Sequence, residues 1–186
     1  MFNIIKKIFI FFLLIISYFS NLYSDEKLID DLKKGGKIVF IRHAIAPGSG
    51  DPDNFKLNDC STQRNLNYAG IRQSKKIGSF FSTNNIPIDL VLSSDWCRCK
   101  DTAKFAFKNF KTFNALNSFF SPRFQKNKEK QMLDLYKYID NWTGKKNLIL
   151  VTHYVVILET LDKAVSSGEI VISDKNLNFI GSIIDY

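Results

Sequence analysis

Short apolar runs, each bounded by polar residues, recur along the chain. Residues 38–41, 89–92 and 148–151 are rich in Val, Ile, Leu and Phe. Runs of this length without polar alternation predict strands that are buried on both faces, as in a parallel sheet. Two later runs, 169–172 and 179–184, predict strands that pair with each other as a closing hairpin.

Longer stretches with apolar residues at helical spacing lie between these runs. Met132, Leu135, Tyr136, Ile139 and Trp142 form one such stripe, which predicts a helix with one side in the core. The remaining predicted elements are helices at 26–34, 66–84, 96–107 and 153–164, and a short strand followed by loop within 113–120. The alternation of strands and helices predicts the α/β class, with a mostly parallel central sheet flanked by helices.

Residues 1–24 have the layout of a secretory signal peptide. Lys6 and Lys7 precede an almost unbroken apolar run over 8–19, and a short polar stretch then ends at Ser24. The run is shorter than the about 20 apolar residues that a membrane-spanning helix needs. We therefore expect a periplasmic or secreted protein, cleaved after Ser24. Contact with the membrane is expected only if this segment is retained as an anchor.

Residues 25–186 are long enough for one folded domain with a substantial core. The whole chain is 45% hydrophobic and 14% aromatic, which argues against disorder. Its formal net charge of +8 permits anionic partners, but the lysines are scattered and there is no nucleic-acid-binding motif. The sequence therefore favours a solvated basic surface and predicts no nucleic-acid partner.

Three cysteines, Cys60, Cys97 and Cys99, would lie in an oxidising compartment if the chain is exported. An odd number leaves one thiol unpaired or paired between chains. We expect a disulfide from Cys60 to either Cys97 or Cys99, and the alternative is three small buried thiols. We expect no metal site, because these thiols lack the fourth ligand that zinc requires.

Polar side chains stand at the ends of the predicted parallel strands. Arg42 and His43 follow the first strand, a pair of serines follows the second, and Thr152 and His153 follow the third. Sites in open α/β sheets form beyond the carboxyl ends of the strands. If the strands are neighbours, the only two histidines of the chain meet there, with Arg98 close by at the start of a helix. Paired imidazoles flanked by guanidinium groups are suited to binding and attacking a phosphoryl group.

The same residues belong to four short motifs. The motifs are Phe40-Ile41-Arg42-His43-Ala44, Arg64-Asn65-Leu66 with Gly70 and Gln73, Leu92-Ser93-Ser94 with Arg98 and Thr102-Ala103, and Leu150-Val151-Thr152-His153. In their order and spacing, over residues 37–165, they resemble the histidine phosphatase superfamily, which includes the cofactor-dependent phosphoglycerate mutases. The segments 59–66 and 96–99 are most similar to small bacterial members of that superfamily.

The resemblance implies a three-layer sandwich of the phosphoglycerate mutase kind and a covalent mechanism. His43 would attack phosphorus and form a phosphohistidine, which water then cleaves. Arg42, Arg98 and His153 would hold the phosphoryl oxygens, while Arg64 either supports substrate binding or is a surface arginine. No metal or cofactor is implied, because guanidinium groups supply the positive charge. The expected protein is an exported phosphatase, acting on a small phosphorylated substrate or a phosphorylated envelope component.

The sequence does not supply an evident proton donor for the leaving oxygen. Mutase-like relatives carry a Glu in the segment that corresponds to 116–125, which has no carboxylate here, and another branch carries an Asp in place of Tyr154. Asp51, Asp53 and Asp59 are candidates, although turn formation is the favoured interpretation of these loop residues. The missing acid argues against a mutase and favours either a substrate with a good leaving group or a slow enzyme. It also leaves open a non-catalytic module that binds phosphate.

Overall fold

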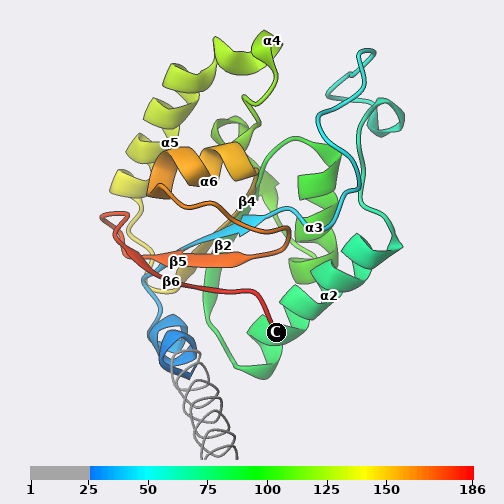
Figure 1. Ribbon diagram of the computed structural model, residues 1–186. Coiled ribbons are helices and arrows are strands. Elements are labelled where there is room, and N and C mark those ends of the chain that lie inside the picture. The colour runs from blue at the N-terminus through cyan, green and yellow to red at the C-terminus, as the bar shows by residue number, and fades with distance from the viewer. Residues whose placement is uncertain (1–25) are drawn as a thin grey trace, which may run out of the picture.

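The computed structural model describes residues 26–186 and contains a six-stranded sheet with helices on both faces (Figure 1). The predicted signal peptide, residues 1–24, lies outside the described residues. The strand order is β3-β2-β4-β1-β5-β6. The strands are β1 (Ile38–Arg42), β2 (Ile88–Ser93), β3 (Lys111–Thr112), β4 (Asn147–Thr152), β5 (Ile170–Ser173) and β6 (Phe179–Ile183).

The sheet is mixed but mostly parallel, as the sequence predicts. Strand β4 pairs in parallel with β1 on one side and β2 on the other, and β2 also pairs in parallel with β3. The closing strands β5 and β6 form the predicted antiparallel hairpin, and β5 pairs antiparallel with β1. In the register of β1 and β4, Arg42 lies opposite Thr152. The residues that follow these strands are therefore brought to one edge of the sheet.

Helices cover both faces of the sheet, which gives the predicted three layers (Figure 1). They are residues 26–34, α2 (Tyr68–Thr83), α3 (Cys97–Phe107), α4 (Pro122–Gln125), α5 (Lys128–Asn141) and α6 (Tyr154–Leu161), with 3-10 turns η1 (Cys60–Thr62) and η2 (Asn114–Leu116). Because side chains alternate along a strand, Val39 and Ile41 pack with 26–34, α2 and α3, whereas Ile38 and Phe40 pack with α5 and α6. Within residues 26–186, no helix is long and apolar enough to span a bilayer.

Several element boundaries differ from the sequence prediction. The short strand expected within 113–120 lies earlier, at β3, because this exposed edge strand has no apolar run to mark it. Helix α2 begins at Tyr68, where the side chain of Asn67 caps it. Helix α6 ends at Leu161, since Asp162 adopts the left-handed conformation. These differences leave the strands that carry the candidate site unchanged.

Candidate active site

The pairing of β1 with β4 brings the two histidines together. The backbone N–H of His43 donates to the carbonyl oxygen of Thr152 at 2.9 Å, and this bond continues the ladder beyond the strand ends. The two imidazole rings lie with centroids 5.5 Å apart, close to perpendicular, and both side chains are buried. His43 and His153, separated by more than a hundred positions in the sequence, therefore face a common cavity of about 300 Å³.

Two arginines line the same cavity and present hydrogen-bond donors that have no protein partner. Nη1 of Arg42, at the end of β1, donates to the carbonyl oxygen of Val165 at 2.6 Å. Arg98, the second residue of α3, is 3% exposed and forms an ion pair with Asp51. Among the described residues, Nε of both arginines is buried without a hydrogen-bond partner. Buried unpaired donors of this kind call for a ligand, and guanidinium groups favour an oxyanion.

His43 is held as a neutral imidazole with a defined tautomer. Its Nδ1 lies 2.9 Å from the carbonyl oxygen of Ala44, which can only accept, so Nδ1 carries the proton. Nε2 therefore carries the lone pair. Burial, and next the positive charge of Arg98, hold the pKa of His43 well below its ordinary value. The ring is thus neutral at neutral pH, and its unprotonated Nε2 is available as a nucleophile.

A short chain of hydrogen bonds fixes His153. Its Nε2 lies 2.9 Å from Oγ of Ser94, whose hydroxyl donates to Oδ1 of Asn117 at 3.0 Å. The backbone N–H of Asp95 also donates to this Oδ1, at 2.8 Å, which identifies it as the amide oxygen. Ser94 therefore accepts from Nε2–H, and Nδ1 of His153 is left for a ligand. Burial and the charge of Arg98 lower the pKa of His153 as well.

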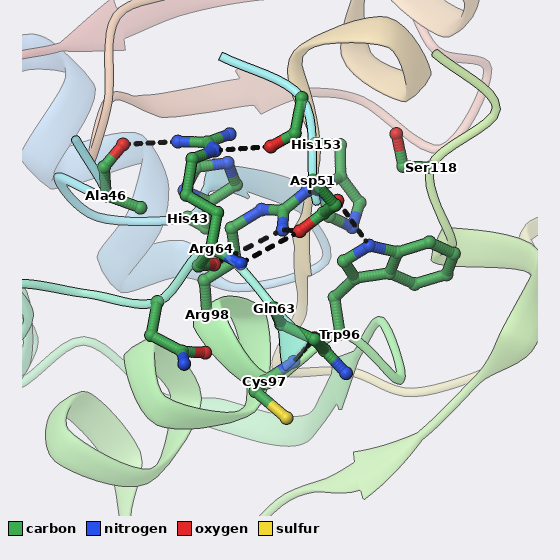
Figure 2. A network of polar contacts seen from close by, with 12 residues as sticks. His43, Ala46, Asp51, Gln63, Arg64, Trp96, Cys97, Arg98, Ser118 and His153 are labelled. Atoms are coloured by element: carbon green, nitrogen blue, oxygen red, sulfur yellow. Dashed lines mark hydrogen bonds and ion pairs between the residues drawn. The ribbon is translucent and has the colours of Figure 1, made fainter. Parts of the chain in front are cut away.

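Asp51 enters the site, so its interpretation as a turn residue is wrong. Its carboxylate accepts from Nη1 and Nη2 of Arg98, at 2.7 and 3.1 Å, in a two-pronged pair. It also accepts from Nε1 of Trp96 at 3.0 Å and from the backbone N–H of Arg64 at 3.1 Å. Figure 2 shows the carboxylate between Arg98 and Trp96. Asp59, in contrast, does form a turn, because its side chain accepts from the backbone N–H of Ser61.

Arg64 lies at the cavity and not on the open surface. Its Nε donates to the carbonyl oxygen of Gly50 at 2.8 Å, and its Nη1 donates to that of Ala46 (Figure 2). These bonds hold the loop that follows β1 against the site. Burial is the largest cause that lowers the pKa of Arg64, followed by the charge of Arg98. Asp53, the third loop carboxylate considered from the sequence, is exposed.

A disulfide joins the loop that follows β1 to α3. Cys60, in η1, is bonded to Cys97, the first residue of the helix, which confirms the expected pairing of Cys60 with one member of the Cys97/Cys99 pair. Beside it, the backbone N–H of Cys97 donates to Oε1 of Gln63 at 2.9 Å. Cys99 is a buried thiol, and burial raises its pKa to about 12. Both contacts are made by Cys97, the residue next to Arg98, so they help to position the arginine that pairs with Asp51.

The far side of the cavity is lined by residues that sequence reasoning did not select. Trp96, Phe120, Phe124 and Ser118 reach it from the start of α3 and from the segment around α4. Tyr154 was noted only as a departure from the family pattern, and its ring lies 5.4 Å from Cζ of Arg42. The sequence gives little indication of the other lining residues, because the periodicity of 113–125 does not distinguish residues that line the cavity from residues of the core. Among residues 26–186, no group of three or more His, Cys, Asp or Glu side chains could hold a metal ion.

Comparison with known proteins identifies the fold. No protein-family model matches the sequence, and no curated protein matches it either. Among solved structures, the protein histidine phosphatase SixA complexed with tungstate aligns with a TM-score of 0.59 at 14% identity, over 79% of this chain and 96% of that one. A phosphoglycerate mutase from Thermus thermophilus aligns with a TM-score of 0.57 at 15% identity, over 81% of this chain and 99% of the other. The chain has the histidine phosphatase fold.

Proposed function

We propose that the protein is a metal-independent phosphohydrolase that works through a phosphohistidine on His43. The observation that carries this proposal is the pairing of a neutral His43, whose Nε2 is unprotonated, with the unpartnered Nε–H groups of Arg42 and Arg98 around one cavity. Such a site binds a tetrahedral oxyanion and presents a nucleophile to it. Tungstate is a tetrahedral oxyanion, and the structure of the fold neighbour SixA in complex with tungstate supports this proposal.

The reaction takes place in two displacements. Nε2 of His43 attacks phosphorus, the N–P bond forms, and the bond from phosphorus to the leaving oxygen breaks. Arg42 and Arg98 balance charge on the phosphoryl oxygens, and the bound phosphate favours protonation of His153, which then donates from Nδ1. A water molecule next attacks phosphorus, the N–P bond breaks, and its electron pair returns to His43, while the water gives up one proton to solvent and the departed leaving group takes one from solvent. The products are the dephosphorylated leaving group and inorganic phosphate.

The test is hydrolysis of acetyl phosphate and trapping of the phosphoenzyme. We expect wild-type protein to release phosphate and, after a rapid quench, to carry a phosphoryl group that is stable in alkali and labile in acid, as phosphoramidates are. His43→Ala should lower the rate by more than about a thousandfold, because the nucleophile is lost. A variant that hydrolyses acetyl phosphate at the wild-type rate would rule out the covalent mechanism.

A non-catalytic phosphate-binding module of the same fold is the second candidate. The observation that favours it is Asp51, the only carboxylate among the described residues that line the cavity, which is committed to Arg98. Such a module would bind orthophosphate or vanadate in wild type and would release no phosphate from acetyl phosphate. Calorimetric binding measured beside the hydrolysis assay therefore separates the two candidates.

The proposed location is the periplasm or the medium, with residues 1–24 acting as the signal peptide. This proposal rests on the lysines, the apolar run and the small residue at Ser24. A protein in this location would meet small phosphorylated molecules or phosphorylated components of the envelope. N-terminal sequencing of the mature protein should begin at Asp25, whereas a retained Met1 in the membrane fraction would indicate an anchor.

A further inference from the structure

The cavity has two chemically different ends. The phosphate end holds the arginines and histidines described above. We call the part of the lining formed by the rings of Trp96, Phe120, Phe124 and Tyr154 the aromatic end, and Val155, Arg123 and three serines also line the cavity. A phosphate monoester bound by the arginines shares the cavity with these rings, so its leaving group lies within reach of the aromatic end. The aromatic end therefore faces the part of the substrate that differs between phosphate esters.

The aromatic wall is a fixed part of the fold. Trp96 and Phe55 are stacked with centroids 5.1 Å apart, and Phe124 packs edge-on against both, at 5.4 and 5.7 Å. Cζ of Arg123, which also lines the cavity, lies 4.9 Å from the ring of Phe55 and 4.8 Å from that of Phe124. The Trp96 ring is also 5.4 Å from that of His153, at an angle of 78°. The wall therefore begins directly beside a phosphate-binding residue.

Phe120 stands at the edge of this wall with an unusually exposed ring. It is 59% exposed, while its neighbour Phe119 is 7% exposed and packs in the core. Other large apolar side chains are also exposed, but Phe120 lines the active-site cavity beside the rings of the wall, which places its exposed ring where a ligand binds. An apolar group bound at the wall would cover the Phe120 ring and remove it from water.

The side chains of the cavity also favour a leaving group that can depart without a proton. Asp51 accepts four hydrogen bonds, two of them from Arg98, so both of its oxygens are already used as acceptors. His43 is the nucleophile, and His153, protonated beside the bound phosphate, donates to a phosphoryl oxygen, so neither imidazole is assigned to the leaving oxygen. An alkoxide needs a proton as it departs, whereas a phenolate is much less basic and can leave without one.

We propose that the aromatic end is a leaving-group subsite for aryl phosphate monoesters, with Phe120, Trp96 and Phe124 contacting the aryl ring. The inference rests on the proposed function and names its substrate class. In the first displacement the bond from phosphorus to the aryl oxygen breaks, the phenolate leaves with the electron pair, and Nε2 of His43 bonds to phosphorus. The phenolate then takes a proton from water.

The first test measures binding without turnover. Phenylphosphonate and methylphosphonate share the anionic group, cannot be hydrolysed, and differ in the ring. We expect wild-type protein to bind phenylphosphonate at least about tenfold more tightly, because the ring is buried at the wall. Phe120→Ala should remove most of this preference and leave the affinity for methylphosphonate unchanged. Phe120→Tyr, which keeps an aromatic ring, should restore the preference.

Phe179→Ala is the matched control, because Phe179 is an exposed ring on β6 that does not line the cavity. It should bind both phosphonates as wild type does. In turnover, Phe120→Ala should lower kcat/KM for phenyl phosphate about tenfold more than it lowers that for acetyl phosphate, whose leaving group is small. Equal affinity of wild type for the two phosphonates, or an equal effect of Phe120→Ala on both, would overturn the inference. The binding arm stays informative even if the protein hydrolyses nothing.

Discussion

At the scale of single residues, the charge balance of the cavity depends on Asp51. Four arginines line the cavity, and Asp51 is the only acidic side chain among the described residues that do so. Its ion pair with Arg98 is nearly dry, with side-chain exposures of 10% and 3%. Removing one member of a buried pair leaves an uncompensated charge, which costs far more than loss of a surface pair.

Asp51→Asn should therefore lower the free energy of unfolding by about 3 kcal/mol, because Arg98 loses its counter-ion and the amide presents a donor to it. Asp134→Asn is the matched control: it breaks the exposed pair of Asp134 with Lys130 and should change stability by less than about 0.5 kcal/mol. Urea titrations of the two variants measure both values.

Orthophosphate should stabilise Asp51→Asn more than it stabilises wild type, since the added anion replaces the missing negative charge beside the arginines. Equal losses of stability in Asp51→Asn and Asp134→Asn would show that the buried pair with Arg98 contributes no more to stability than an exposed ion pair. An equal gain from phosphate in wild type and variant would show that Asp51 does not oppose the anion.

The sequence predicts the positions of the two histidines in the site, but it does not predict that of Asp51. His43 and His153 each follow a buried parallel strand, and the carboxyl ends of neighbouring parallel strands meet at one edge. Asp51 lies within a long loop, whose path no periodicity describes. Hydrogen bonds from Arg98, Trp96 and Arg64 set the position of Asp51. Its role in the site can therefore be recognised only once the loop is folded onto the sheet.

At the scale of elements, the disulfide from Cys60 to Cys97 joins that loop to α3. The two cysteines are 37 positions apart, and a closed loop of this length reduces the entropy of the unfolded chain enough to contribute about 4 kcal/mol. The double variant Cys60→Ser/Cys97→Ala should lose a similar amount of stability. Dithiothreitol should lower the urea midpoint of wild type and leave that of the double variant unchanged.

Cys99→Ala is the control for the disulfide, because this buried thiol is outside the bond. It should lose only about 1 kcal/mol and should remain sensitive to dithiothreitol. A wild-type midpoint that does not respond to reduction would contradict a stabilising role of the Cys60–Cys97 bond. Loss of phosphate binding on reduction would further indicate that the bond keeps Arg98 in place.

Strands and helices differ in how well the sequence specifies them. Strands β1 and β4 contain continuous apolar runs over 38–41 and 148–151, and β2 contains a shorter one over 90–92, because both faces of the sheet are covered there. Strand β3 is two exposed residues long, and its pairing with β2 depends on where the chain goes after α3. The segment after it combines η2 and α4 with the aromatic wall, so its apolar residues serve the core and the cavity at once.

At the scale of the whole molecule, the three-layer fold encloses two histidines that are neutral at neutral pH. The layers bury both rings, and the arginines beyond the strand ends add positive charge near them. Both pKa values are therefore lower in the folded state than the ordinary 6.5 of an exposed histidine. The folded protein therefore binds protons at these two histidines less readily than the unfolded chain does. This difference makes the free energy of unfolding depend on pH.

The free energy of unfolding should fall as the pH decreases from about 6.5 to 5. Below pH 6.5 the unfolded chain takes up protons on both histidines while the folded protein does not, so each contributes a loss approaching about 1.4 kcal/mol per pH unit. Urea titrations at several pH values measure this slope, and His43→Gln/His153→Gln should flatten it. A saturating phosphate ligand should reduce the slope in wild type, because its charge allows His153 to be protonated in the folded state. A slope that is the same in the double variant would assign the acid sensitivity to groups outside the site.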